Sequence, residues 1–296
     1  MAQLIWKDEF NINVDYIDNA HQKLVRVLNK TISLIEEQDF AKTKHACLES
    51  IKFLKTYTVQ HFAQEEEYQL KIGYAGYATH KAIHDNLREN VLPALEEDLE
   101  KQDFSKEAVT YFLSVFTGWL YSHILIEDRA IVGTALSRYN KPADMEDAKL
   151  LDVEFSELMK NLFGIKASLV DSHYQGQLLD NALYYVLDFV RKDVGSTTKI
   201  VIIGEKKLVT YMIKVLTNGG FTQLDKNSLG AYFQLAYNCA LEIMDLLHKG
   251  EHYELASHKL VDNAELNRIY AHQLPEHGII WKTDYGRIGC CVLSKA

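Results

Sequence analysis

Apolar residues recur at alternating spacings of three and four through the first half of the chain, from about residue 18 to 136. This period describes one buried stripe along a helix. A typical stretch comprises His21, Leu24, Val25, Leu28, Ile32 and Ile35. Polar breaks near 37–40, 71–74 and 101–105 divide the region into four long segments with short connections. We therefore expect an antiparallel four-helix bundle, an all-α fold.

The second half of the chain mixes strand and helix patterns. Runs rich in β-branched and aromatic residues at 182–190 and 199–204 are typical of strands. The last run, 278–293, is typical of a β-hairpin. Helical spacing separates or precedes these runs, at about 151–163, 206–218 and 227–248. This mixture predicts an α+β domain.

A polar stretch at 137–144 lies between the two patterns. It contains Pro142, which cannot continue a helix. We place a linker there and expect a multidomain chain, with the bundle at 1–138 and the α+β domain at 148–296. The 296 residues are enough for two separate cores.

Charge and composition limit the classes of partner. The formal net charge of −9 argues against binding nucleic acid or an anionic membrane through the whole surface. The N-terminus lacks a basic-then-apolar leader, and no apolar run reaches roughly 18 residues, so we expect a cytoplasmic protein. The four cysteines have no CxxC spacing and are expected to be reduced thiols. The unusual feature is the count of 12 histidines.

Several of these histidines have a regular relation to the predicted turns. His61 and Glu65 are four residues apart, as are His80 and His84, so each pair projects from one face of its helix. Residues at equal depth in a helical hairpin straddle the turn symmetrically. The midpoint of His21 and His61 is residue 41, at the first break, and the two i, i+4 pairs are centred on the second.

The third break gives the same result, because the midpoint of His84 and His123 falls within 101–105. All four helices therefore deliver histidine to one level, which predicts a buried metal centre. Imidazole with carboxylate and without thiolate suits iron, and two metals can share bridging carboxylates inside a bundle. Five histidines, two bridging carboxylates and a bridging solvent oxygen would leave one position open for a small diatomic ligand.

Five motifs carry a resemblance to a known family. They are Trp6, Asp18-x-x-His21, His61-Phe62-x-x-Glu65-Glu66, His80-x-x-x-His84 and Trp119-Leu120-x-x-His123-Ile124-x-x-x-Asp128. In order and spacing they resemble the bacterial hemerythrins, over residues 1 to about 136. The resemblance implies a non-haem diiron centre of Fe2+/Fe3+ ions with an oxo or hydroxo bridge and O2 as ligand. It assigns His80, His84 and His123 to one iron, His21 and His61 to the other, and Glu65 and Asp128 as bridges.

Spacing alone does not select the second bridging carboxylate. Glu127 is four residues after His123 and shares its face of an ideal helix, whereas Asp128, at five, lies about 140° away. The family pattern favours Asp128, which we follow. By the same resemblance Trp119 lines the oxygen pocket, with core filling as the alternative interpretation.

Two other features are interpreted from the same segment. We interpret Glu66 and Glu67 as charged side chains exposed to solvent. The sequence Tyr68-Gln69-Leu70 departs from the family, since it lacks the methionine that is common after the acidic pair.

The C-terminal region resembles, more loosely, the CheX-like chemotaxis phosphatases. In that family a Glu and an Asn three residues later position water against an aspartyl phosphate. Gln234 and Tyr237 stand at those positions here, and a Gln cannot carry the negative charge that acts on the attacking water. We therefore expect a degenerate module that binds a partner or dimerises, and no phosphatase activity.

These interpretations lead to three candidate functions. The first is an oxygen or redox sensor that signals through the CheX-like module to a chemotaxis response regulator or another signalling protein. The second is an oxygen carrier or store with a docking or dimerisation domain. The third is a response-regulator phosphatase gated by oxygen.

Overall fold

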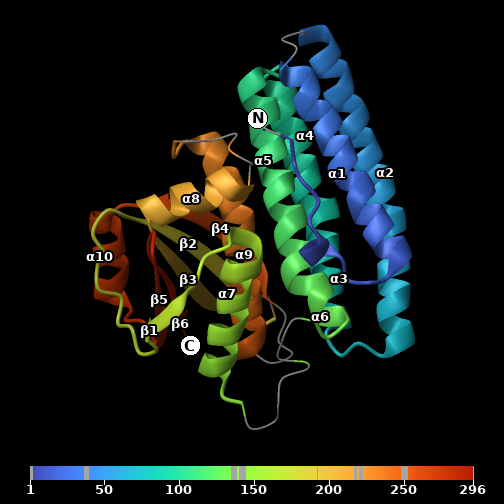
Figure 1. Ribbon diagram of the computed structural model, residues 1–296. Coiled ribbons are helices and arrows are strands. Elements are labelled where there is room, and N and C mark those ends of the chain that lie inside the picture. Colours follow the sequence, from blue (N-terminus) through green and yellow to red (C-terminus); the bar gives the residue numbers. More distant parts are fainter. Residues whose placement is uncertain are drawn as a thin grey trace. The chain divides into compact units, whose positions relative to one another are not determined.

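The computed structural model describes residues 3–36, 40–134, 139, 145–191, 193–216, 219, 223–247 and 253–295. The chain divides into two compact units, the first of residues 1–140 with 213–231 and the second of residues 141–212 with 232–296. Figure 1 shows a helical bundle in the first and a helix-covered sheet in the second. Apart from Tyr139, the predicted linker at 137–144 lies outside the described residues, as does the predicted break at 37–39. The predicted fold classes, all-α followed by α+β, are confirmed.

The bundle contains four long helical stretches (Figure 1). After a short 3-10 turn, η1 (Asp8–Phe10), they are α1 (Asp15–Glu36); α2 (Phe40–Ile72); α3 (Tyr77–Asn86), η2 (Leu87–Val91) and α4 (Leu92–Lys101) in succession; and α5 (Lys106–Ser122), η3 (His123–Asp128) and α6 (Arg129–Ile131) in succession. The elements η2 and η3 are π-helical turns within the third and fourth stretches. Such turns add one residue to the hydrogen-bonded ring and rotate the side chains that follow.

Local chemistry ends these helices at the predicted breaks. Gly73 follows α2 with a φ of 68°, a left-handed conformation that glycine adopts without a steric penalty. The hydroxyl of Ser105 accepts a hydrogen bond from the backbone N–H of Ala108 and caps α5. Both turns lie where the histidine spacing requires them, so the helices on either side are in the expected register.

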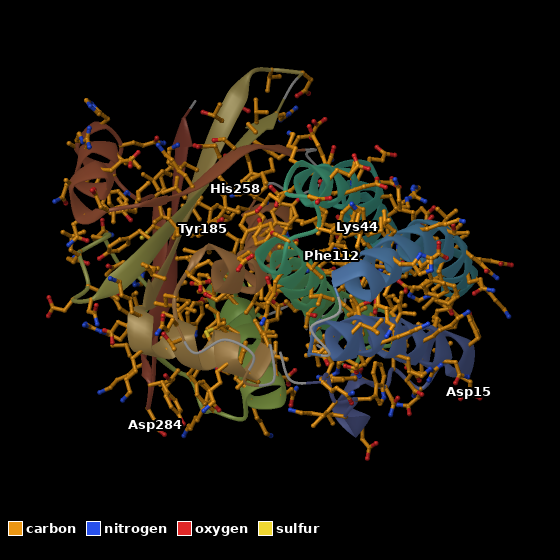
Figure 2. All side chains as sticks on the ribbon, turned by 90° about the horizontal axis from the view of Figure 1, so that it is seen from above. Asp15, Lys44, Phe112, Tyr185, His258 and Asp284 are labelled. Carbon is orange, nitrogen blue, oxygen red and sulfur yellow. The ribbon has the colours of Figure 1, made fainter. Side chains whose placement is uncertain are left out.

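The fourth stretch is the most apolar part of the chain. Residues Lys106–Ile131 are long and apolar enough to cross a membrane by length and composition, but 83% of their most apolar window is buried inside the protein. The central helix of a bundle has the same character. Phe112, labelled in Figure 2, is 1% exposed, whereas Asp15 lies at the edge of the bundle.

The second unit is built on one antiparallel sheet with the strand order β1-β5-β6-β3-β2-β4. Its strands are β1 (Ser168–Asp171), β2 (Ala182–Arg191), β3 (Ser196–Glu205), β4 (Glu254–Val261), β5 (His277–Thr283) and β6 (Gly286–Lys295). Its helices are α7 (Asp147–Phe163) and α10 (Asn263–His272), together with α8 (Lys206–Leu216) as far as residue 212 and α9 (Lys226–Leu247) from residue 232 on. Two predicted helix ends lie outside the described residues: residues 217–218 of the helix predicted at 206–218, and residue 248 of the helix predicted at 227–248.

Alternating side chains of the central strands are buried on both faces of this sheet. Tyr184 and Val186 of β2 join the core that Leu266 of α10 completes. Tyr185 of β2 faces the other way and packs on Phe233 of α9, with ring centroids 5.1 Å apart. Burial on both faces explains why β2 reads as a continuous apolar run.

The edge strands β1 and β4 and the helix α10 were not predicted from the sequence. Every residue of β1 is exposed, and most residues of β4 are exposed as well. Antiparallel pairing with β2 defines β4. Across these two strands the hydroxyl of Tyr185 lies 3.0 Å from Nδ1 of His258, and both residues are labelled in Figure 2.

Candidate metal centre

The structure brings all seven predicted ligand side chains together inside the bundle. Each is 2% exposed or less. They are His21 on α1, His61 and Glu65 on α2, His80 and His84 on α3, and His123 and Asp128 at the two ends of η3. One ligand atom from each member of a group lies within 4.8 Å of the others in two groups: Glu65, His80, His84 and His123 in the first, and His21, His61 and Glu65 in the second.

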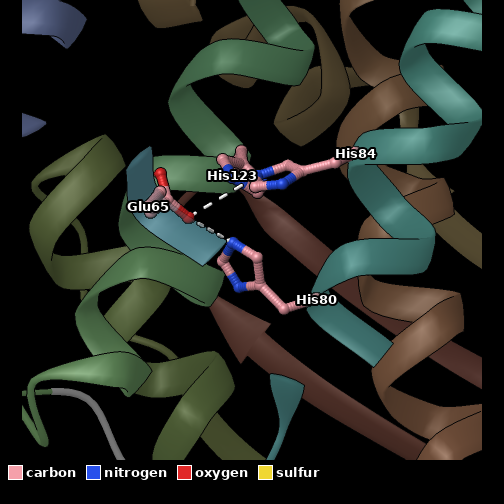
Figure 3. Close-up of side chains that lie close together, drawn as sticks. All are labelled: Glu65, His80, His84 and His123. Atoms are coloured by element: carbon pink, nitrogen blue, oxygen red, sulfur yellow. Dashed lines mark hydrogen bonds and ion pairs between the residues drawn. The ribbon is translucent and has the colours of Figure 1, made fainter. Parts of the chain in front are cut away.

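Glu65 belongs to both groups and gives one oxygen to each. Its Oε1 lies 2.5 Å from Nε2 of His80 and 3.5 Å from Nε2 of His84 (Figure 3). Its Oε2 lies 3.6 Å from Nε2 of His61 and 3.9 Å from Nε2 of His21. A carboxylate divided in this way has the arrangement of a ligand that bridges two metal ions.

Asp128 repeats the same division. Its Oδ1 lies 3.1 Å from Nε2 of His123 and 3.5 Å from Nε2 of His80, both in the first group. Its Oδ2 lies 3.3 Å from Nε2 of His21 in the second group. The two carboxylates therefore connect the same two groups of histidines.

The π-helical turn η3 explains why Asp128 reaches the site. On an ideal helix Glu127, at i+4 from His123, would share its face. A π turn takes more residues per revolution, so a residue at i+5 returns to the same face. Asp128 consequently points to His123 across the turn, and Glu127 is not a member of either group among the described residues.

Burial favours the neutral form of His21, His61, His84 and His123. It lowers the pKa of His61 and of His123 to about 4, and it lowers the pKa of His21 and His84 well below the usual value. A neutral imidazole offers a nitrogen lone pair to a metal without first losing a proton.

The two carboxyl groups differ in charge preference. Burial acts to raise the pKa of Glu65, but the surrounding histidines, His80 foremost, outweigh it and hold that pKa well below its usual value. Burial and the neighbouring charge of Glu65 raise the pKa of Asp128 well above its usual value. Two acidic groups buried side by side favour a shared cation between them.

The residues fit a pair of metal ions. Among the described residues, several buried polar atoms have no hydrogen-bond partner: both ring nitrogens of His21, Oε2 of Glu65 and both carboxylate oxygens of Asp128. Such atoms are costly to bury unless something coordinates them. Imidazole and carboxylate donors without thiolate are the set that non-haem iron takes in helical bundles.

Glu66 differs from its interpretation as a solvated charge. Its Oε1 lies 3.1 Å from Nδ1 of His84, and its side chain is 15% exposed. An N–H donated from Nδ1 leaves Nε2 of His84 as the metal-facing nitrogen, the usual arrangement behind a metal-bound histidine. Glu67, one residue further on, is exposed as expected.

Aromatic rings line the first group. Trp119 is 1% exposed and stacks on His123, with centroids 4.6 Å apart. Phe62 stacks on His84 at 3.7 Å and lies 5.7 Å from Trp119. These contacts suit both core filling and an apolar ligand pocket, the two interpretations given to Trp119.

The positions predicted in the second unit, Gln234 and Tyr237, both lie on α9. Tyr237 stacks over Phe189 of β2, with centroids 6.4 Å apart. Burial raises its pKa. Tyr237 thus acts as a core side chain against the sheet.

A helical bundle that holds histidines from four helices around two shared carboxylates is a metal-binding bundle protein. A family model described as the hemerythrin HHE cation binding domain matches residues 13–135. The bacteriohemerythrin of Clostridium acetobutylicum is 32% identical over 130 residues, which are 43% of this chain and 98% of that protein. The bacteriohemerythrin of Methylococcus capsulatus is 32% identical over 146 residues, covering 46% of this chain and 99% of that protein. The chain belongs to the hemerythrin family.

The C-terminal half has its own structural neighbours. A crystal structure of a chemotaxis protein CheX from Desulfovibrio desulfuricans aligns with 51% of this chain and 100% of its own, at 13% identity and a TM-score of 0.37.

Proposed function

We propose that this chain holds two iron ions in the bundle, binds O2 there reversibly and reports the bound state through its C-terminal domain. The division of Glu65 and Asp128 between the two histidine groups carries the first part of the proposal. Two bound irons would supply an open coordination position and the electrons for reversible O2 binding. Because the donor set that the described residues provide is rich in histidine and holds only two carboxylates, we place it in the class of oxygen-binding proteins and not of diiron oxidases, whose bundle sites hold more carboxylates.

Each part of the site has a task in this proposal. His80, His84 and His123 would hold one ion, and His21 and His61 would hold the other. Trp119 and Phe62 exclude water from the first group. The open position for O2 would lie on the ion held by His21 and His61, which has one histidine fewer. A dry pocket favours reversible binding because water is needed to carry away the charged products of oxidation.

The test is an iron count and an optical spectrum. The protein is loaded anaerobically with Fe2+, and the spectrum is recorded before air, after air, and after O2 is removed. We expect about two irons per chain and an air-dependent band that disappears when O2 is removed. Loss of iron on gel filtration, or a band that never reverses, would overturn the proposal.

The sensing part of the proposal rests on a contact at the exit of the bundle. The hydroxyls of Thr79 and Tyr139 lie 3.0 Å apart, and Tyr74 packs edge-on against Tyr139 at 5.8 Å. Thr79 immediately precedes His80 on α3, and Tyr139 leads toward the C-terminal unit. A shift of α3 on oxygenation would therefore move Tyr139, which precedes the second unit in the chain.

Hydrogen exchange separates sensing from storage. In a sensor, α7 exchanges at different rates in the deoxygenated and oxygenated protein, and Tyr139→Phe diminishes that difference without changing the iron content. Tyr16→Phe, which alters an exposed tyrosine of the bundle, is the control. Equal exchange rates in both states would identify an oxygen store instead.

The second domain is proposed to bind a signalling protein without hydrolysing a phosphate. Gln234 stands where the catalytic carboxylate of the phosphatases would be, and the ring of Tyr237 is occupied in packing on Phe189. Release of phosphate from a phosphorylated response regulator, at a rate that depends on the oxygenation state, would contradict this part and favour a gated phosphatase.

A further inference from the structure

Gln69 is a buried amide that touches the candidate metal centre. It lies on α2 one turn after Glu65 and two turns after His61, so the three side chains share one face of the helix. It is 0% exposed, and its Nε2 donates a hydrogen bond to Oε1 of Glu65 at 3.2 Å. None of the expectations drawn from the sequence gave it a function.

The burial of this amide is unfavourable for the fold. Its carbonyl oxygen, Oε1, has no hydrogen-bond partner among the residues that the structure describes. An apolar side chain of equal length would fill the same space without leaving a buried acceptor unpaired. The contact with Glu65 is therefore the feature that distinguishes glutamine from an apolar residue at this position.

The amide of Gln69 differs in kind from the histidines that contact Glu65. His80 contacts the same oxygen, but through Nε2, the nitrogen that would turn to a metal. Gln69 contacts Glu65 through its amide NH2 group, which cannot bind a metal, and the amide stays neutral at any pH. Its hydrogen bond can therefore persist when the histidine nitrogens are engaged by metal.

We propose that Gln69 is a positioning residue for Glu65. Its amide orients Oε1 of Glu65 toward the group of His80, His84 and His123, and it withdraws negative charge from that oxygen. The inference rests on the proposed diiron function. A carboxylate held by a fixed donor needs no rearrangement to bind a metal, and partners of this kind raise metal affinity. A hydrogen bond to its oxygen also reduces the charge that the carboxylate gives to iron, which favours Fe2+ over Fe3+.

The test compares Gln69→Met with the wild type. Methionine has a similar length and can fill the same space, but it cannot donate a hydrogen bond. Gln64→Met makes the same exchange at an exposed position of α2 and is the matched control. Gln69→Leu is a second variant in case methionine disturbs folding.

Three measurements are made on the full chain. Fe2+ affinity is measured by competition with a colorimetric chelator, and we expect Gln69→Met to lose about 10- to 100-fold. The midpoint potential is measured by anaerobic titration, in which the electrode supplies one electron to each Fe3+. We expect a lower midpoint potential in Gln69→Met. A tenfold shift of the equilibrium toward Fe3+ corresponds to a decrease of about 59 mV for a one-electron couple. Urea unfolding of the metal-free protein should show equal or greater stability, because the unpaired oxygen is gone.

The outcomes are distinct. Weaker Fe2+ binding and a lower potential in Gln69→Met, with Gln64→Met unchanged and metal-free stability maintained, support the inference. Wild-type affinity and potential in both Gln69 variants overturn it and leave the diiron proposal intact. A lower metal-free stability that accounts for the whole loss of affinity also overturns it, because the residue is then structural. A wild-type protein that holds no iron overturns the proposed function and this inference together.

Discussion

Glu65→Gln tests whether one carboxylate serves two metal ions. Glutamine keeps the size and shape of the side chain, but it removes the negative charge and replaces one of the two oxygens by an NH2 group, which cannot bind a metal. Oε1 and Oε2 of Glu65 contact different histidine groups, so the amide can serve one group at most. We expect the iron content to fall from about two per chain to one or fewer.

The size of the effect follows from the burial of the site. Glu65 is 0% exposed, and four histidines lie within 4 Å of its oxygens. Loss of one partner from a buried charged pair costs about 3–5 kcal/mol. With about 1.4 kcal/mol per tenfold, Fe2+ affinity should weaken by about a hundredfold to a few thousandfold.

The assay is the iron content after gel filtration together with chelator competition. Glu67→Gln makes the same exchange two residues away at an exposed position and should keep both irons. A far-ultraviolet circular dichroism spectrum confirms that the helices persist in both variants. If Glu65→Gln retains two irons with wild-type affinity, the shared-carboxylate interpretation is wrong.

Three further predictions concern stability and reactivity. Phe62→Ala removes a fully buried ring stacked on His84 and should destabilise the metal-free bundle by about 3–5 kcal/mol, measured by urea unfolding; a loss below about 1 kcal/mol would contradict close packing there. Ser105→Ala removes the cap of α5 and should cost about 1 kcal/mol in the same assay, with no change in iron content. Burial raises the pKa of Cys47 and of Cys291 to about 12, so a thiol reagent should label them at pH 8 only after unfolding; since the unfolded thiols release their protons first, near pH 9, stability should fall as the pH rises from there toward 12. Rapid labelling of either thiol in the native protein would show that the burial is incomplete.

Much of the first unit followed from spacing. The breaks at 71–74 and 101–105 coincide with the ends of α2 and α4. Gly73 ends α2, and Ser105 caps the start of α5 directly after the second of these breaks. Antiparallel helices rise at one rate, so residues equidistant from a turn lie at one depth. The histidines could therefore be placed at one level without coordinates.

The choice between Glu127 and Asp128 could not be made in this way. An ideal helix assigns Glu127 to the ligand face, and it is the π turn η3 that exchanges the two. The sequence did not reveal the functions of Glu66 and Gln69 for a related reason, because each looks like an ordinary helix residue. Glu66 is identified only by its contact with His84 on the neighbouring helix, and Gln69 only by its burial and its hydrogen bond to Glu65. The one available signal was Gln69 continuing the four-residue series from His61 and Glu65.

In the second unit, strands buried on both faces were recognisable and exposed ones were not. The continuous apolar runs of β2 and β3 mark the centre of the sheet. The edge strands β1 and β4 carry mostly exposed side chains and have no such run, because their place in the sheet depends on backbone hydrogen bonds that any residue can make.

The sequence by itself determined the helical periods, the turns and the depth of the histidines, since these depend on local spacing and on chain chemistry within a few residues. Only the tertiary structure decided which oxygen of each carboxylate faces which group, which carboxylate enters the site, and which polar neighbours stand behind the ligands. Those choices depend on a local change of helical pitch and on contacts between side chains far apart in the chain. Such contacts exist only once the helices are packed.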